Sequence, residues 1–169
     1  MKFRLLSISA SLCFLAACGG YPDFATQPSD CHAIRITHNN NQLTLCKDTA
    51  WYVDNNGSPL FYADNGKTEA LLNTLSDMSI QGISTYNPEK GFQYKVEILN
   101  SSNKVSKTLE FNPIAQSPNL VGSCNGSESY IVGIPGLSIS PSINFNPDPE
   151  YWTQDPAGNR PGQCGRYQL

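Results

Sequence analysis

The fold class is decided by the stretch FQYKVEILNSSNKVSKTLEF, residues 92–111. Apolar and polar residues alternate over 92–98 and again over 105–111. An alternation with period two is typical of a β-strand that has one face buried and the other in water. The residues between the two halves, 100–104, are polar. The stretch therefore predicts two half-buried antiparallel strands joined by a short connection.

Shorter strands are expected on both sides of this hairpin. Residues 33–36 and 43–45 alternate in the same way, and the asparagine pair 39–40 can supply the two central residues of a tight turn. We expect Ile36 to lie opposite Leu43 in the resulting hairpin. Further strand candidates are 51–53, 130–132, 137–139 and 143–145.

One helix is predicted between these strands. Asp64 is a good N-cap residue, and Gly82 lies just past the expected end. The apolar residues in between recur at helical spacing and form one stripe: Leu71, Leu72, Leu75 and Met78. Because such a stripe must be buried, the sequence predicts an α+β fold, an antiparallel sheet with one main amphipathic helix packed on a face.

Residues 1–17 have the features of a signal peptide. Lys2 and Arg4 form a basic start, and the run 5–17 is apolar apart from a few serines. A run of about thirteen residues is too short for a membrane-spanning helix, which needs ~20. We therefore expect residues 1–17 to be removed on export.

The leader ends in Leu15-Ala16-Ala17-Cys18-Gly19, which resembles the lipobox of bacterial lipoproteins. The resemblance implies that the small residues fit a peptidase cleft and that the thiol of Cys18 takes a diacylglyceryl group. Two or three acyl chains anchor a protein stably where one does not. Gly19, in place of Asp, implies the outer membrane of a double-membraned bacterium, facing the periplasm. The alternative is an ordinary secreted protein cleaved near Ala17, with Cys18 a spare thiol.

The chain behind the leader divides into two expected regions. Residues 18–30 contain two Gly, two Pro and no periodic apolar pattern, which is typical of a tether. Residues 31–169 are expected to form a single α+β domain. Its C-terminal segment, from about 146, is rich in proline and irregular.

Four cysteines remain in this domain: Cys31, Cys46, Cys124 and Cys164. An even number in an exported protein suggests two disulfides that brace the fold, and three pairings are possible. The expected hairpin places Ala33 opposite Cys46, with Cys31 on the same face but one diagonal step away. A diagonal step is slightly too long for a relaxed bridge, so the chain would have to bend where it enters the strand. We still favour Cys31–Cys46 together with Cys124–Cys164.

The chain carries no motif for catalysis, a cofactor or a metal ion. It lacks H-E-x-x-H, G-x-S-x-G, a P-loop and the Rossmann glycine fingerprint. His32 and His38 could serve as bases. His32 could also join Cys31 and Cys46 at a metal ion, but the adjacent side chains of Cys31 and His32 would point apart on a strand. Three carboxylates lie close together near the C-terminus, but their spacing does not match that of a calcium-binding loop: Asp148, Glu150 and Asp155. We expect no enzyme, no cofactor and no bound metal.

Composition and aromatic content indicate which classes of ligand the chain could bind. The chain has 15% charged residues, a net charge of -3 and no basic cluster, so we expect no nucleic-acid partner. Its aromatic residues could fill the core or line a groove for a sugar or a peptide: Trp51, Tyr52, Phe61, Tyr62, Tyr151 and Trp152. We favour the core, and keep Tyr151 and Trp152 as a tentative binding surface.

The expected domain also resembles a known family. It is similar to an uncharacterised bacterial domain, often repeated in membrane-tethered partners of gliding-motility-type ABC transporters. The similar elements span roughly residues 33–155: Trp51-Tyr52-Val53, Ala63-Asp64 before a helix with Leu71-Leu72 and Leu75, a strand hairpin, Tyr130-Ile131-Val132 and Phe145-x-x-Asp148-x-x-x-Trp152. That family has no established catalytic residues. Because this chain is a single lipid-anchored copy with cysteines, a transporter partner does not follow.

These features favour a lipid-anchored envelope protein without enzymatic activity. The membrane is the first expected partner, through lipid on Cys18, and another envelope protein or complex is the second. A module that binds peptidoglycan or another glycan is the alternative, and a hydrolase is the third hypothesis.

Overall fold

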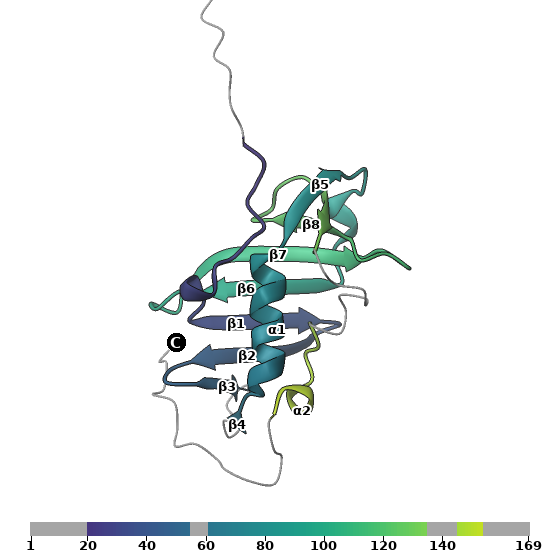
Figure 1. Cartoon of the computed structure of the whole chain (residues 1–169). Coiled ribbons are helices and arrows are strands. Elements are labelled where there is room, and N and C mark those ends of the chain that lie inside the picture. Colours follow the sequence, from purple (N-terminus) through teal and green to yellow (C-terminus); the bar gives the residue numbers. More distant parts are fainter. Residues whose placement is uncertain (1–19, 55–60, 135–144, 154–169) are drawn as a thin grey trace, which may run out of the picture.

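The computed structural model describes residues 20–54, 61–134 and 145–153. In this part of the chain nine antiparallel strands form one sheet, and a twelve-residue helix, α1, lies across one face (Figure 1). The sheet order is β4-β3-β2-β1-β6-β7-β8-β9-β5. The strands are β1 (Ala33–His38), β2 (Asn41–Lys47), β3 (Trp51–Asp54), β4 (Phe61–Tyr62), β5 (Ser79–Ile83), β6 (Tyr94–Leu99), β7 (Val105–Pro113), β8 (Leu120–Cys124) and β9 (Tyr130–Gly133). The helices are α1 (Asn65–Ser76), α2 (Pro149–Trp152) and two 3-10 turns, η1 (Pro28–Asp30) and η2 (Pro88–Lys90).

Both predicted hairpins are confirmed. In β1–β2, Ile36 lies opposite Leu43. Asn39 and Asn40 have φ angles of 50° and 67°, the left-handed conformation that a tight hairpin turn requires and that asparagine tolerates. The second hairpin joins β6 to β7, and β6 also pairs with β1. The two hairpins therefore form the centre of the sheet.

The helix begins as predicted but ends earlier. Asp64 is its N-cap, and the carboxylate accepts a hydrogen bond of 3.0 Å from the backbone N–H of Lys67. The helix stops at Ser76, not near Gly82, which lies in the edge strand β5. Met78 is buried although it lies outside the helix, because the chain turns there from α1 into β5. Because Met78 is buried and has helical spacing from Leu75, the apolar pattern in the sequence continues beyond the end of the helix.

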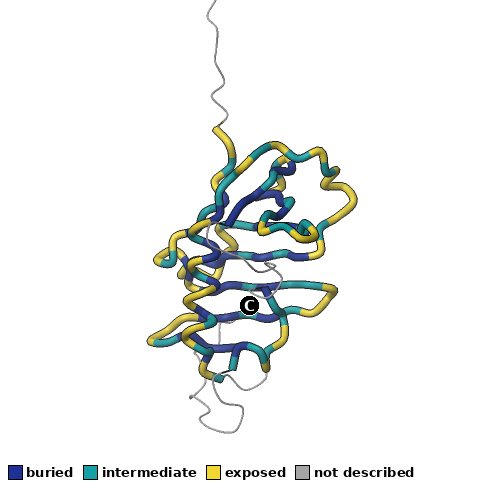
Figure 2. The backbone as a smooth tube through the Cα atoms, turned by 45° about the vertical axis from the view of Figure 1, so that its right-hand side comes forward, coloured by how far each residue is buried: buried dark blue, intermediate teal, exposed yellow. Residues whose placement is uncertain are grey.

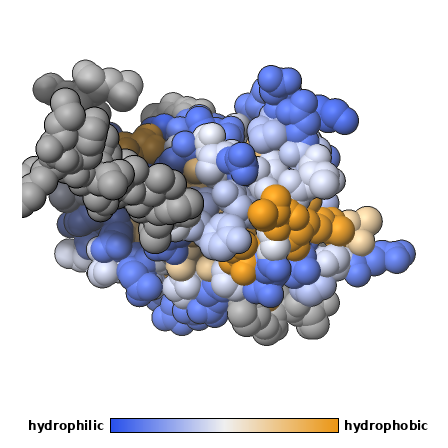
Figure 3. All heavy atoms as spheres, turned by 90° about the horizontal axis from the view of Figure 1, so that it is seen from above, coloured by the Kyte–Doolittle hydropathy of each residue, from blue (hydrophilic) through white to orange (hydrophobic). Residues whose placement is uncertain are grey.

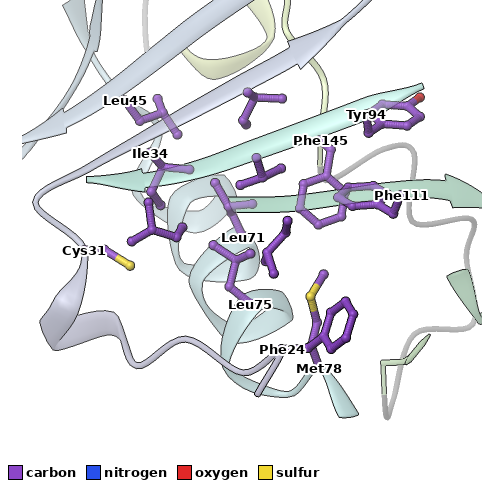
Figure 4. Close-up of a cluster of buried hydrophobic side chains, with 14 of the residues drawn as sticks. Phe24, Cys31, Ile34, Leu45, Leu71, Leu75, Met78, Tyr94, Phe111 and Phe145 are labelled. Atoms are coloured by element: carbon purple, nitrogen blue, oxygen red, sulfur yellow. The ribbon is translucent and has the colours of Figure 1, made fainter. Parts of the chain in front are cut away.

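The main core lies between α1 and the sheet (Figure 4). Leu71 and Leu75 are fully buried and face the central strands. Phe111 of β7 packs against Phe145, with 4.6 Å between the ring centroids. Figure 2 shows that buried residues follow the strands while exposed residues concentrate in the connections. Of the other strand candidates, 51–53 and 130–132 are confirmed as β3 and β9, whereas 137–139 and most of 143–145 lie outside the described residues.

The segment that we expected to be a tether packs on the domain. Phe24 is 4% exposed and its ring lies 6.1 Å from that of Tyr130. The backbone N–H of Thr26 donates a hydrogen bond of 2.9 Å to the carbonyl of Leu75 at the end of α1. The folded structure therefore includes residues from Phe24 onward and does not begin at Cys31.

The expected Cys31–Cys46 disulfide is absent, and no disulfide joins the cysteines of the described residues. Cys31 belongs to the core beneath α1, whereas Cys46 lies with Ala33 in a smaller cluster on the opposite face of the sheet. The prediction failed because Cys31 ends the turn η1 and strand β1 begins only at Ala33. The alternation of the strand therefore does not extend back to Cys31. The other expected pair, Cys124–Cys164, cannot be placed, since Cys164 lies outside the described residues.

The helix cap gives a prediction for stability. We expect Asp64→Ala to lower the free energy of unfolding by about 0.5–2 kcal/mol, because the N–H of Lys67 loses its acceptor. Urea denaturation measures the change. The matched control is Asp77→Ala at the other end of α1, where a negative charge opposes the helix dipole and its removal should be close to neutral. Equal losses in the two variants would contradict the capping role.

Candidate functional site

Trp152 is part of the core, which removes it from the tentative binding surface. Its side chain is 1% exposed, and the indole N–H donates a hydrogen bond of 2.6 Å to the carbonyl of Asn146. Its own carbonyl accepts a 2.7 Å hydrogen bond from the N–H of Asp64. An isolated antiparallel β-bridge between Ala63 and Thr153 adds a second main-chain contact between these two segments. Residues 145–153 therefore pack at the β4 edge of the sheet and at the start of α1.

Tyr151 lies beside Trp152 and is half-buried. The ammonium group of Lys67 stands 4.5 Å from the centre of its ring and also donates to the Tyr151 carbonyl. Burial raises the pKa of the Tyr151 hydroxyl, and the nearby charge of Asp64 adds to the effect. The cation thus occupies one face of the ring, which is then not open for stacking on a sugar.

Tyr62 is the most exposed of the aromatic residues that could form a groove. It is 39% exposed, and its ring centroid lies 5.1 Å from that of Tyr52, its partner across β3 and β4. Trp51 is buried on the other face, with Lys47 above its ring. The aromatic residues are therefore divided between two faces of the sheet and do not form one groove.

The two histidines are not placed to act together. The backbone N–H of His32 donates to the carbonyl of Leu99 at one end of β1. His38, at the other end, stacks on Tyr94 with 4.1 Å between the ring centroids. They are six residue steps apart along an extended chain, a distance of about 20 Å. His38 serves packing in this arrangement.

The carboxylates near the C-terminus have a structural role. Asp148 accepts a 3.0 Å hydrogen bond from the N–H of Glu150 and so caps α2. Asp155 lies outside the described residues. Among the residues that the structure describes, no three metal-binding side chains lie close enough to hold an ion, and no helix is long and apolar enough to cross a bilayer.

One ionic row lies on the sheet face that α1 does not cover. Glu97 of β6 accepts hydrogen bonds from Arg35 of β1 at 3.0 Å and from Lys95 at 2.8 Å. Partial burial alone would raise the pKa of Glu97, but the hydrogen bonds and charges of Lys95 and Arg35 outweigh it and lower the pKa. The row ties β1 to β6 and leaves no free base.

The buried thiols hold the N-terminal segment. Cys31 donates to the carbonyl of Gln27 at 3.6 Å, and Cys124 donates to that of Asp23 at 3.5 Å. Burial, with a smaller contribution from the charge of Asp30, raises the pKa of Cys31 to about 11. Burial also raises the pKa of Cys124. Both thiols are therefore protonated donors at neutral pH, and neither is an activated nucleophile.

This protonation is directly testable. For Cys31, a pKa of about 11 in place of 9.0 means a roughly hundredfold lower thiolate fraction, so iodoacetamide at pH 8 should modify the folded protein far more slowly than the urea-unfolded protein. Because the folded-state pKa is the higher one, the thiol stabilises the fold fully below pH 9 and loses this effect as the pH rises toward 11. Rapid modification, or a mass that reveals a Cys31–Cys46 bond, would contradict the structure.

A shallow polar hollow of about 420 Å³ borders the same segment. Lys107 lies in it and donates to the carbonyl of Ala25. The hydroxyl of Thr26 is buried there without a hydrogen-bond partner. The remaining lining residues are Ser29, Asp30, His32, Ile98, Asn100, Ser101 and Ser106. The lining of the hollow contains hydroxyl groups, one acidic side chain and one lysine. Among the described residues, none of these hydroxyl groups is hydrogen-bonded to the imidazole of His32.

Comparisons with family models, with curated proteins and with solved structures found no match. The two resemblances described above therefore rest on the residues quoted for them.

Proposed function

We propose that this chain is a lipid-anchored protein of the bacterial outer membrane, which acts by binding another envelope protein and not by catalysis. The observation that carries the proposal is the run Leu15-Ala16-Ala17-Cys18-Gly19, which resembles a lipobox and lies a few residues before Phe24 enters the folded core. Acylation at Cys18 would keep the domain close to the membrane surface, because the linking chain is short. A domain kept there is well placed to recruit or support a neighbouring protein.

The arrangement of the candidate catalytic residues supports a binding role. His32 and His38 lie at opposite ends of β1, and each thiol in the described residues is buried. The polar side chains that could do chemistry instead cap helices or join strands, as Asp148 and Glu97 do. A hydrolase would need a nucleophile and a base within hydrogen-bond reach.

In-cell photocrosslinking tests the binding role. The crosslinking residue is placed at Tyr62, which is exposed and lies in β4, at the end of the sheet away from the N-terminal segment. We expect a discrete adduct with one envelope protein, and we expect Cys18→Ser to abolish it because the domain is no longer kept at the membrane. Adducts only with lipid, or a diffuse set that Cys18→Ser leaves unchanged, would contradict the proposal.

The alternative function, binding of peptidoglycan or another glycan, is favoured by one observation. Tyr62 exposes a ring beside Tyr52, and such aromatic surfaces can stack on sugars. Retention on purified sacculi measures it. Loss of retention in Tyr62→Ala but not in Tyr21→Ala, an exposed tyrosine at the opposite end of the sheet, would place glycan binding above protein binding.

A further inference from the structure

The end of the sheet nearest the N-terminus carries an exposed apolar patch. Tyr21 is 68% exposed and Ile83 is 67% exposed. The Tyr21 ring lies 5.9 Å from that of Tyr130 in β9, and Ile83 in the edge strand β5 pairs directly with the same Tyr130. We call the exposed Tyr21 and Ile83, together with the buried Tyr130 that both contact, the anchor-side patch. Figure 3 looks onto this end and shows hydrophobic residues gathered among hydrophilic ones.

The length of chain between the patch and Cys18 is short. Three residues lead from Cys18 to Tyr21, and an extended chain of that length spans at most about 11 Å. If Tyr21 lifts off, the next attachment is Asp23, whose carbonyl accepts a hydrogen bond of 3.5 Å from the thiol of Cys124, so the span from Cys18 grows only to about 18 Å. Figures 1 and 2 both show the described chain starting at the β5 end of the sheet. Whatever holds Cys18 therefore lies next to the anchor-side patch.

We propose that the anchor-side patch rests on the lipid surface of the membrane that holds the protein. This inference rests on the proposed acylation of Cys18. A partner protein at the patch would have to fit between the domain and the bilayer, where only about 11–18 Å of chain is available. Tyrosine and isoleucine suit the boundary between headgroups and acyl chains, since tyrosine combines an apolar ring with a polar hydroxyl.

The contact depends on apolar insertion more than on charge. Asp23 lies two residues from Tyr21, and Glu128 lies two residues from Tyr130, so acidic groups flank the patch in sequence. Anionic lipid would not attract such a surface. The anchor compensates, because a tethered surface meets its partner at a high effective concentration and needs only weak affinity. The strands then lie along the membrane, and the β4 end with Tyr62 points away from it.

Tryptophan quenching by brominated lipid tests this orientation. The full chain is produced with its leader, its N-terminal mass is measured, and it is placed in phosphatidylcholine vesicles whose acyl chains carry bromine near the headgroups. The native Trp51 and Trp152 are buried at the β3 and α2 end, so they give an unquenched baseline. Ile83→Trp reports on the patch. Tyr62→Trp, an exposed aromatic position at the other end, is the matched control.

We expect bromine to remove a severalfold larger fraction of the added emission in Ile83→Trp than in Tyr62→Trp. If Cys18 is acylated but Ile83→Trp is not quenched, or if both variants are quenched equally, the inference is overturned and the lipid anchor stands. The emission of Ile83→Trp could instead shift to shorter wavelength as the protein concentration rises, without quenching by bromine. That result would assign the patch to a second copy of the chain. An N-terminal mass without acyl groups would overturn the proposed function itself.

Discussion

Trp152→Ala is expected to lower the free energy of unfolding by about 3–5 kcal/mol, the range for removal of a large aromatic side chain from a core. The indole is 1% exposed and donates to the carbonyl of Asn146, so the variant leaves both a cavity and a buried acceptor without its partner. The main-chain contact between Trp152 and Asp64 also depends on this packing. Equilibrium unfolding in urea measures the loss.

Tyr62→Ala provides the comparison for Trp152→Ala. Tyr62 is an aromatic residue at the same end of the sheet, but it is 39% exposed and should contribute much less. A loss below about 1 kcal/mol for Trp152→Ala, or equal losses for the two variants, would contradict the core role of the indole. If Trp152→Ala does not fold, Trp152→Phe keeps most of the apolar volume and still removes the donor.

Phe24→Ala has the second large expected effect. Phe24 is 4% exposed, and its ring packs on Tyr130 and over Gly122. Truncation of a buried phenylalanine weakens packing by about 3 kcal/mol or more, which corresponds to roughly a hundredfold in the local opening equilibrium. The amide of Thr26, bonded to the carbonyl of Leu75, should therefore exchange its hydrogen about a hundredfold faster.

The control for Phe24→Ala is Tyr21→Ala in the same segment. Tyr21 is 68% exposed, so its removal should leave exchange at Thr26 nearly unchanged. If Phe24→Ala also leaves this amide protected, the segment is held by other contacts and Phe24 is not its main attachment. The result matters for function, because attachment of this segment determines how closely the domain follows Cys18.

The local patterns in the sequence predicted the centre of the fold. Alternation over 92–98 and 105–111 identified β6 and β7, and the pair Asn39-Asn40 fixed the register of the first hairpin. In both cases residues adjacent in sequence determine the structure. The cap at Asp64 was predicted for the same reason.

Features that depend on distant contacts were missed. Strand β8 includes Gly122 and Ser123, so it shows no clear apolar alternation. The glycine leaves room for a distant ring: a Cβ there would lie 3.3 Å from Phe24 and 3.2 Å from the carbonyl of Glu110. The one signal for this contact was a lone phenylalanine in a segment rich in proline and glycine. The composition of the segment, which is typical of a tether, outweighs that signal.

The pairing of the cysteines also depends on backbone geometry that a local sequence pattern does not show. Counting residues back from β1 placed Cys31 on the face of Cys46, but the turn η1 reverses that placement and buries the thiol under α1. An even number of cysteines in an exported chain indicates disulfides only when the backbone also brings them together. The candidate surface failed at Trp152 because a sequence alone does not separate a buried aromatic residue from an exposed one.

The central claim is that the thiol of Cys18 carries the lipid that holds this domain at a membrane. The most direct measurement is the mass of the N-terminal peptide of the protein made in a Gram-negative host fed labelled palmitate. We expect a chain that begins at Cys18, bears acyl groups and contains the label, and we expect neither in Cys18→Ser. A wild-type chain without label, or a Cys18→Ser chain that is processed and retained on the membrane like the wild type, would contradict the account.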